Sequence, residues 1–381
     1  MAARCDVLVV GGGPVGACLA LLLSESGMSV TLLEARGVNS DDPRTIALSY
    51  GSALLLQRIG VWPQIEPSTA IQSVHVSQAG GFGRTLLRAS EQGVPALGYV
   101  TTYGGVHAAL SRRLSKCMNV SLRQGVRAER VEADAAAAQA TISSEAGEER
   151  LSARLAVLAD GGQLSAEVAQ QRGRDYGQAA VVAHVQADTP HAGRAFERFC
   201  AKGPIALLPA QSGYALVWTT ATQESERLLA LGAADFLAAL QSAFGDRAGR
   251  FVSVGPRAVF PLKLKVALRP RAGRIVLLGN AAQTLHPVAG QGLNLGFRDA
   301  DALAALVAAG PATLDDAELA RRFHDARHSD RRTTVGLTDS MVRAFSNDLA
   351  PLRVARGCGL TLLDLVPPAK RLFAQRMMFG G

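Results

Sequence analysis

The fold is decided by the stretch CDVLVVGGGPVGACLALLLSESGMSVTLLEAR, residues 5–36. Two short apolar runs in it, VLVV and SVTLLE, predict buried strands, and the apolar-faced segment ACLALLLSESG between them predicts a helix. The spacing G-x-G-x-x-G at the first strand-to-helix turn is made by Gly11, Gly13 and Gly16. The order strand, glycine turn, helix, strand predicts a βαβ unit, and hence an α/β fold.

The chemistry of this turn indicates a dinucleotide site. Gly11 makes the tight turn, Gly13 lets the backbone approach a pyrophosphate, and Gly16 lets the helix pack on the strand. The helix that follows presents free N–H groups and a partial positive charge to the phosphates. Glu34 ends the second strand, where a carboxylate can accept hydrogen bonds from ribose hydroxyls. A βαβ unit with glycine-rich turns and no ligand is the alternative.

A second glycine-rich stretch is GNAAQTLHPVAGQGLNLG, residues 279–296. It follows the strand-like run RIVLLG and leads into a helix that is expected to begin near Leu293, which aims a second helix N-terminus at a ligand. In a flavoprotein the natural target is the pyrimidine edge of the flavin, which becomes anionic on reduction. Gly290 and Gly292 permit close backbone approach, and Pro287 fixes the preceding turn. The stretch therefore favours FAD over NAD.

The composition of the chain argues against several other classes of protein. The 381 residues are 48% apolar and carry a formal net charge of +8, but aromatics are few and no run of Lys or Arg exceeds two, so nucleic-acid binding has little support. The five cysteines form no C-x-x-C pair, so neither a disulfide framework nor a metal site is predicted. No signal sequence precedes the first strand and no apolar run is long enough to span a bilayer. We expect a cytoplasmic protein, with membrane contact only at the inner-membrane surface.

A third motif, VLADGGQLS, places Asp160 and Gly161 after another strand-like run. The three motifs in this order resemble the group A FAD-dependent aromatic monooxygenases. The segments RTIALSYGS, GRAFERF and GNAAQTLHP resemble the ubiquinone-biosynthesis hydroxylases of that family, and are closest to the 2-octaprenyl-6-methoxyphenol hydroxylases. The resemblance covers almost the entire chain. It implies a Rossmann-like FAD-binding domain of the p-hydroxybenzoate hydroxylase type, an inserted mixed or antiparallel β-sheet substrate domain, and a C-terminal helical segment.

The resemblance also implies a discontinuous domain organisation. The predicted divisions are 1–72, 98–175 and 257–345 for the FAD-binding domain, 73–97 and 176–256 for the substrate domain, and 346–381 for the C-terminal helical segment. Trp218 and Phe199 are candidates for a substrate cavity, although single aromatics on strands more often belong to the core. The C-terminal segment is apolar with interspersed Arg and Lys, and three placements stay open: on a membrane surface, over a tunnel for a lipid tail, or packed on the flavin domain.

The predicted cofactor-binding residues combine the glycine turns with positions that the resemblance implies. They are Gly11, Gly13, Pro14, Gly16, Glu34, Arg44, Asp160, Gly161, Asn280, Pro287, Gly290, Gln291, Gly292 and Asn294. Asn280 stands where the broader family has aspartate; an amide can still donate and accept hydrogen bonds there. No flavin contact is carried onto Thr102 or Tyr103. His286 is a candidate polar group beside the flavin, without assignment as a general base.

The activity implied by the resemblance is hydroxylation of a polyprenyl phenol, 2-polyprenyl-6-methoxyphenol, in ubiquinone biosynthesis. FAD is the cofactor, NAD(P)H and O2 are the co-substrates, and the family transfers oxygen from a flavin C4a-hydroperoxide. Alternatives that stay open are another ring position, a soluble phenol, and a non-catalytic flavin-binding scaffold. Peripheral membrane contact and a complex with other ubiquinone-biosynthesis proteins are further expectations.

Overall fold

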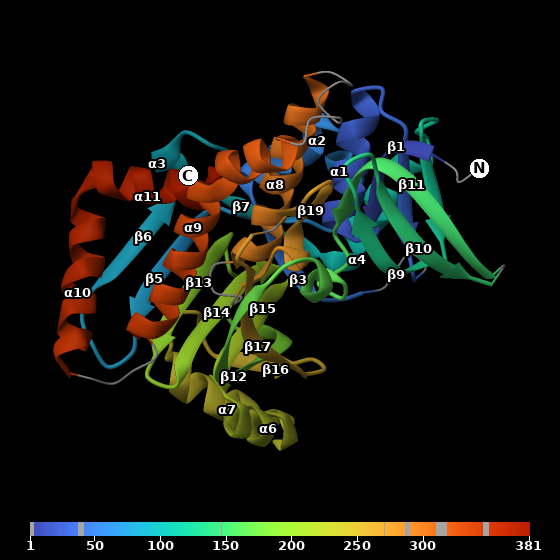
Figure 1. Ribbon diagram of the computed structural model, residues 1–381. Helices are drawn as coiled ribbons and strands as arrows, with labels where there is room; N and C mark the ends of the chain where they lie inside the picture. Colours follow the sequence, from blue (N-terminus) through green and yellow to red (C-terminus); the bar gives the residue numbers. More distant parts are fainter. Residues whose placement is uncertain are drawn as a thin grey trace.

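The computed structural model describes residues 4–36, 42–145, 147–269, 271–285, 290–309, 318–345 and 350–381. The strands of these segments pair into an eight-stranded, a nine-stranded and a three-stranded sheet. The eight-stranded sheet lies at the right of Figure 1 and the nine-stranded sheet extends toward the lower left. Helices pack on both large sheets, so the predicted α/β architecture is confirmed.

The eight-stranded sheet contains the predicted βαβ unit. Its strands in spatial order are β18 (Arg271–Ala272), β19 (Ile275–Leu277), β11 (Gly147–Leu158), β1 (Arg4–Val10), β2 (Val30–Glu34) and β8 (Val120–Gln124), with β10 (Ala138–Ser144) paired to β11 and β9 (Arg127–Ala133) paired to β10. The four pairings β19–β11, β11–β1, β1–β2 and β2–β8 are parallel. Their carboxyl ends meet at one edge, where an α/β sheet binds its ligands.

Three helices cover one face of this sheet and bury an apolar core against it: α1 (Pro14–Glu25), α4 (Tyr103–Leu114) and α8 (Gln291–Ala308). α8 approaches α1 closely at Gly296, where a Cβ atom would lie 2.6 Å from Cγ2 of Val15. Because the two helices are packed side by side, their N-termini reach the same edge of the sheet.

The nine-stranded sheet is mixed, as expected for the substrate domain. It consists of β20 (Gln283–Thr284), β17 (Ala258–Ala267), β12 (Gln171–Ala187), β15 (Gly213–Ala221), β14 (Gly203–Ala210), β13 (Arg194–Cys200), β5 (Ser73–Gln78) and β6 (Arg84–Arg88), with β16 (Phe251–Val254) paired to β12. β13 and β5 are parallel, and the other pairings are antiparallel. The helices α6 (Thr222–Ala230) and α7 (Ala233–Phe244) lie beside it, and α7 buries Phe236 and Phe244 against one face.

A small sheet of β3 (Thr45–Ser49), β7 (Gly98–Thr102) and β4 (Thr69–Ile71) contacts the second sheet. The remaining elements are α2 (Tyr50–Arg58), η1 (Trp62–Gln64), α3 (Ala89–Gln92), α5 (Ser165–Val168), η2 (Gly279–Ala281), α9 (Leu319–Phe345), α10 (Ala350–Leu365) and α11 (Pro367–Phe379). The last two confirm the helical C-terminal segment. α10 stands at the margin of the molecule beside β6 (Figure 1).

Strand pairing bears on the predicted domain division, which remains a prediction. β12 runs without a break through the predicted boundary at residue 175. β17 falls in the stretch predicted for the FAD-binding domain, but it pairs with β12 in the second sheet. Within the described segments, no helix is both long and apolar enough to cross a membrane.

Candidate cofactor and substrate site

A cavity of about 560 Å³ lies at the carboxyl edge of the parallel strands, between the N-termini of α1 and α8. It brings together most of the predicted cofactor-binding residues: Gly11, Gly13, Pro14, Glu34, Arg44, Asp160, Gly161, Asn280 and Gly292. Gly16 packs behind the glycine turn, and Gly290, Gln291 and Asn294 line an adjoining cavity. The predicted His286 and Pro287 lie outside the described residues.

The glycine turn presents bare backbone to this cavity. Gly11 has a φ of +105°, and a Cβ atom there would lie 2.4 Å from the carbonyl oxygen of Ala159. At Gly16 a Cβ atom would lie 1.9 Å from the carbonyl oxygen of Gly11. At Gly13 the nearest atom would be the Tyr103 hydroxyl at 3.4 Å. The first and third glycines therefore close the turn, and the second faces the space that a pyrophosphate would need.

Two carboxylates on the cavity wall hold the surrounding loops. The Glu34 carboxylate accepts hydrogen bonds from the backbone N–H groups of Gly12 and Arg36, both at 2.8 Å. Asp160 accepts from the backbone N–H groups of Gly162 at 2.9 Å and Leu164 at 2.7 Å. Each carboxylate oxygen has a further lone pair, so both groups can still accept hydrogen bonds from a bound ligand.

The predicted Arg44 lies on this wall among three side chains that the sequence analysis did not assign, those of Asp42, Tyr103 and His107. The Arg44 guanidinium forms an ion pair with Asp42 at 2.6 Å and lies 4.5 Å from the centre of the Tyr103 ring. The hydrogen bond from Arg44 lowers the pKa of Asp42, and burial raises the pKa of the Tyr103 phenol. His107 places Nε2 3.0 Å from the carbonyl oxygen of Gly12. Tyr103 begins the helix α4 and His107 lies one turn further, so only the fold brings them to the glycine turn.

The N-terminus of α8 is held against β3 by Asn294. Its Oδ1 accepts hydrogen bonds from Ser49 N and Ser52 Oγ, both at 2.8 Å. Its Nδ2 donates to the carbonyl oxygens of Ala47 at 3.0 Å and Gly290 at 2.7 Å. These bonds satisfy the buried amide, so the observed contacts of Asn294 position the helix terminus.

Gly290 and Gly292 open the backbone at the start of α8. Gly290 has a φ of +59° at the N-cap, a left-handed conformation that glycine adopts without strain. At Gly292 no atom of the described residues lies within 4 Å of the position that a Cβ would take. Asn280, on the facing 3-10 turn, has an exposed side chain and lines the same cavity. The structure thus places an uncapped helix N-terminus and an amide beside open space.

A second cavity, of about 370 Å³, adjoins the first. The two share Ile46, Gly292 and Leu293 as lining residues. The walls of the second cavity are mainly apolar side chains from β3, β5, β6, β13, β14, α9 and α11, including Val74, Leu87, Leu208, Met341, Phe373, Met377 and Met378. α11 therefore forms part of the wall of a cavity suited to an apolar ligand. Trp218 and Phe199 are buried and do not line it.

Glu197, on β13, is the only ionisable side chain among the residues described as lining this apolar cavity. It forms no side-chain hydrogen bond with the described part of the chain. Although the carboxyl borders the cavity, the surrounding protein shields it from bulk water, and this burial raises its pKa to about 7. The segment GRAFERF was identified by its family resemblance, but no role was predicted for Glu197. Side chains alternate along β13, so Ala195 and Glu197 lie on one face of the strand and both line the cavity.

The residues of the first cavity fit FAD. The glycine turn and the α1 N-terminus suit a pyrophosphate, Glu34 suits a ribose, and the α8 N-terminus lies where a ring system could extend toward the apolar cavity. A nicotinamide dinucleotide needs one helix N-terminus, for its pyrophosphate. The second N-terminus, that of α8 at the boundary of the two cavities, therefore favours FAD. The arrangement is that of a cofactor site whose reactive end meets an apolar substrate site.

Comparison with known proteins supports this class. The chain matches the FAD binding domain family over residues 4–335 and belongs to that family. It is 36% identical to the ubiquinone hydroxylase UbiL of Rhodospirillum rubrum, over 98% of this chain and 89% of the relative. It is 30% identical to the 3-demethoxyubiquinol 3-hydroxylase of Escherichia coli, over 96% of each chain. The human ubiquinone biosynthesis monooxygenase COQ6 is 27% identical over 96% of this chain and 90% of its own length.

Solved structures agree on the fold. The p-nitrophenol 4-monooxygenase PnpA of Pseudomonas putida superposes with a TM-score of 0.81 at 19% identity, and the match covers 100% of this chain and 99% of that one. The resemblance stated from the motifs is therefore confirmed. The chain is an FAD-dependent aromatic monooxygenase whose relatives are ubiquinone hydroxylases, and NAD(P)H and O2 are the typical co-substrates of its family.

Proposed function

We propose that the chain hydroxylates the aromatic ring of a polyprenyl phenol, with 2-polyprenyl-6-methoxyphenol as the substrate, in ubiquinone biosynthesis. The observation that carries the proposal is the apolar cavity that joins the cofactor cavity at Gly292. Such a cavity suits a ring with an apolar tail better than a soluble phenol, because removing apolar surface from water stabilises the complex by roughly 25 cal/mol per Å².

The chain's own residues would bind and orient the reactants. The glycine turn, Glu34, Asp160 and Asn280 are proposed to hold FAD, with Arg44 at its flank and the backbone at Gly290 and Gly292 near its ring system. Bound FAD, once reduced by NAD(P)H, would activate O2, so that one oxygen atom is transferred to the ring and the other leaves as water. The apolar walls exclude water from the reacting ring. Asn294 and Gln291 keep the α8 terminus in place: Asn294 bonds to β3, and Gln291 donates to Met377 O on α11 at 3.3 Å.

Glu197 is proposed to orient the phenol. With a pKa near neutral, its carboxyl can accept the proton of a phenolic hydroxyl or share a hydrogen bond with it. A phenol that gives up its proton is a more electron-rich ring, which favours attack on an electrophilic oxygen. The rest of the described lining offers amides and hydroxyls, but no other acid or base.

The experiment that tests this function is mass spectrometry of quinone intermediates in a strain that lacks the gene. We expect a polyprenyl phenol one hydroxyl short of the next intermediate to accumulate, and its structure identifies the ring position. Complementation separates an enzyme from a scaffold: a Gly13→Val chain that binds no flavin should fail to restore the quinone. An unchanged quinone profile in the deletion strain would refute the proposal.

Two broader expectations belong with this proposal. A hydroxylase of a polyprenyl substrate must meet that substrate where it is dissolved, so we propose peripheral contact with the inner membrane from the cytoplasm. A complex with other enzymes of the pathway would serve the same need.

A further inference from the structure

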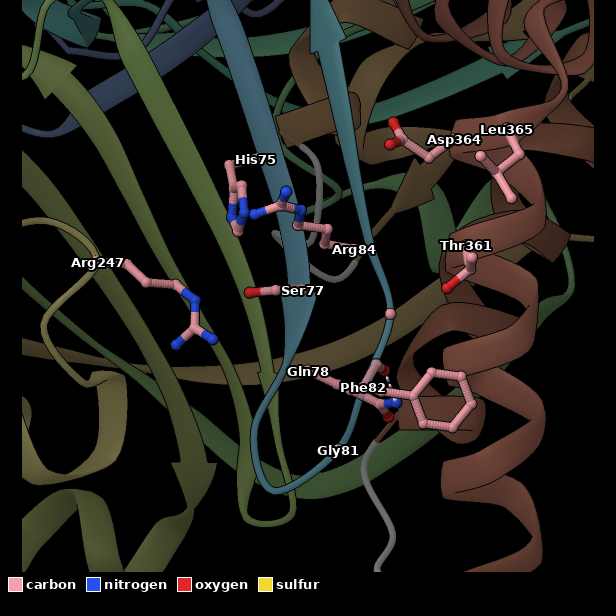
Figure 2. A pocket seen from close by; sticks show the side chains of 11 residues that line it. His75, Ser77, Gln78, Gly81, Phe82, Arg84, Arg247, Thr361, Asp364 and Leu365 are labelled. Atoms are coloured by element: carbon pink, nitrogen blue, oxygen red, sulfur yellow. Dashed lines mark hydrogen bonds between the residues drawn. The ribbon is translucent and has the colours of Figure 1, made fainter.

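A second pair of cavities lies on the opposite side of β5, β6 and β13 from the apolar cavity. Side chains alternate along a strand, so Val74 and Val76 face the apolar cavity while His75 and Ser77 face the other way. The two cavities, of about 370 and 340 Å³, share His75, Arg84, Arg247 and Asp364 as lining residues. Figure 2 shows Arg84 pointing toward His75, with Arg247 approaching the same face from the other side.

This face carries an excess of positive charge. Besides Arg88, four arginines gather on it, Arg84, Arg194, Arg198 and Arg247, and we call these four the arginine cradle. Within the described part of the chain, none of the four has a carboxylate oxygen within ion-pair distance.

The other charged groups nearby already pair with one another. Arg88 pairs with Glu91 at 2.9 Å, and Lys370 pairs with Glu91 at 3.0 Å and with Asp364 at 3.3 Å. Asp364 also accepts a hydrogen bond from Leu86 N at 3.0 Å. The two carboxylates are thus engaged by Arg88 and Lys370, and within the described segments the four arginines of the cradle form no ion pair.

Two buried nitrogen atoms at the cradle have no hydrogen-bond partner among the residues that the structure describes. Arg198 is only 8% exposed, and its Nε has no partner; its Nη1 makes only long contacts of 3.3 Å with Ser77 Oγ and 3.4 Å with the carbonyl oxygen of Gln78. His75 Nδ1 is likewise buried and unpaired. A buried donor without a partner costs free energy, so the site is suited to an acceptor supplied from outside.

The guanidinium groups are close enough for their charges to act together. Burial, and then the charges of Arg247, Arg84 and Arg194, lower the pKa of His75. Burial, and then the charge of Arg247, lower the pKa of Arg198. Like charges held together repel one another, and a bound anion would relieve this repulsion. Guanidinium forks match the oxygens of a phosphate, which they bind in pairs of parallel hydrogen bonds.

The mouth of the cradle is apolar. Phe82 and Leu365 line it and are 54% and 72% exposed. α10 packs on β6 through one face, where Thr85 Oγ1 donates to the carbonyl oxygen of Leu360 at 2.7 Å. Its other face exposes Leu352, Val354, Leu362 and Leu365. A phosphate site beside an exposed apolar helix face matches the headgroup and upper acyl chain of a phospholipid.

We propose that the arginine cradle binds the phosphate of an anionic phospholipid headgroup, with the exposed face of α10 in the headgroup layer of the membrane. This inference rests on the membrane contact included in the proposed function, and it names the lipid class and the site. A pyridine nucleotide is a poorer occupant, because the sheet separates the cradle from the cofactor cavity and hydride could not reach the flavin. This contact would hold at the membrane the face of β5 and β13 that points away from the apolar cavity.

The test is flotation of the FAD-loaded full-length chain with vesicles of two compositions: phosphatidylcholine alone, and phosphatidylcholine with about one third phosphatidylglycerol. We expect binding to the anionic vesicles that weakens with salt. Arg84→Gln/Arg247→Gln should raise the lipid concentration for half-maximal binding at least tenfold, and Leu362→Ser/Leu365→Ser should also weaken binding. Arg150→Gln/Arg172→Gln removes the same charge at exposed positions elsewhere and should change binding less than twofold. Flavin content and thermal unfolding report that each variant is folded.

The outcomes distinguish a lipid phosphate from free inorganic phosphate, and they distinguish the role of the cradle from membrane contact as such. If inorganic phosphate binds the wild type by calorimetry and the double arginine variant loses only that binding, the site takes a free anion and the lipid proposal is wrong. Equal binding of the arginine variant and its control to anionic vesicles would also overturn it, while membrane contact itself would stand. No binding to either vesicle would refute the membrane contact and the cradle's role together. Hydroxylation of substrate in detergent is measured separately and decides the proposed activity.

Discussion

At the scale of a single residue, Glu197 shows how the fold can set the chemistry of a site. An aliphatic cavity would bind a polyprenyl chain without any acid, and a carboxyl that faces such a cavity costs stability when it ionises. The chain retains one, with a pKa raised by burial to about 7 from the ordinary 4.5. Its retention at the substrate side suggests a use in binding or activating a phenol.

The first prediction concerns the pH dependence of stability. Because the folded state holds the proton of Glu197 more tightly than the unfolded chain, the wild type should lose stability as pH rises from about 4.5 to about 7. Glu197→Gln removes this loss, so the variant should gain on the wild type by on the order of 3 kcal/mol between pH 5 and pH 8. Urea unfolding at both pH values measures it, with the exposed Glu226→Gln as the control. Parallel pH profiles for wild type and variant would show that Glu197 is not held in an apolar environment.

The second prediction concerns Asn280, the amide where the broader family has aspartate. Asn280→Asp places a negative charge in the cofactor cavity, near the diphosphate and at longer range near the reduced flavin. Unit charges about 8 Å apart interact by roughly 2 kcal/mol at an effective dielectric of ~20, and solvent at this exposed side chain reduces that. We expect weaker FAD binding or a lower flavin reduction potential, with the fold intact. Unchanged affinity at an unchanged potential would leave the amide without an electrostatic role.

At the scale of elements, the third prediction concerns the N-terminus of α8. Among the described residues no atom lies within 4 Å of a Cβ placed on Gly292, so Gly292→Val should fold normally. Its side chain would project where the two cavities meet, and FAD affinity should fall at least tenfold. Gly336→Val is the matched control, since it adds the same side chain to open space on α9. Flavin fluorescence titration of both variants measures the effect; a Gly292→Val chain that binds FAD like wild type would mean that this terminus does not face the flavin.

The fourth prediction concerns the buried ion pairs that join α8 to α9. Asp299 has no exposed surface and pairs with Arg327 at 2.7 Å and Arg331 at 3.0 Å. Asp299→Asn leaves the buried Arg331 guanidinium without its carboxylate and leaves Arg327 with Asp330 alone, and should lower the free energy of unfolding by roughly 3–5 kcal/mol. Asp301→Asn, on the same helix but in an exposed pair with Arg58, should cost less than about 1 kcal/mol. Urea denaturation compares the two; similar losses would contradict the role given to burial.

The buried ion pairs of Asp299 also explain part of the stretch 279–296, which leads into α8. Gln283, where the broader family carries histidine, is buried and donates to Asp299 Oδ2 at 3.0 Å. The amide therefore contacts a structural carboxylate in the described structure. Gly11, Gly16 and Gly290, by contrast, were predictable from the sequence, because each has a left-handed conformation or a close backbone approach that favours glycine.

At the scale of the whole molecule, the sequence predicted those features of the fold that short stretches of sequence determine. The βαβ unit, the mixed second sheet and the C-terminal helices follow from periodicity and from the family resemblance. The apolar cavity could not be predicted in this way, because its walls come from strands and helices far apart in the sequence. Tyr103 and His107 were missed for the same reason: only the packing of α4 brings them to the glycine turn. The arginine cradle likewise depends on the register of β13 with β5, which no short motif encodes.

We propose that the two joined cavities bring bound FAD and a phenol together, so that one oxygen atom of O2 is transferred to the phenol ring. The direct measurement is turnover of the purified FAD-loaded protein with NADH or NADPH, a short-chain 2-prenyl-6-methoxyphenol and ¹⁸O2, followed by mass spectrometry of the product. We expect a hydroxylated ring that carries one ¹⁸O atom, with one product molecule formed for each NAD(P)H molecule oxidised. Oxidation of NAD(P)H that yields only hydrogen peroxide, with the phenol recovered unchanged at saturating concentration, would contradict it.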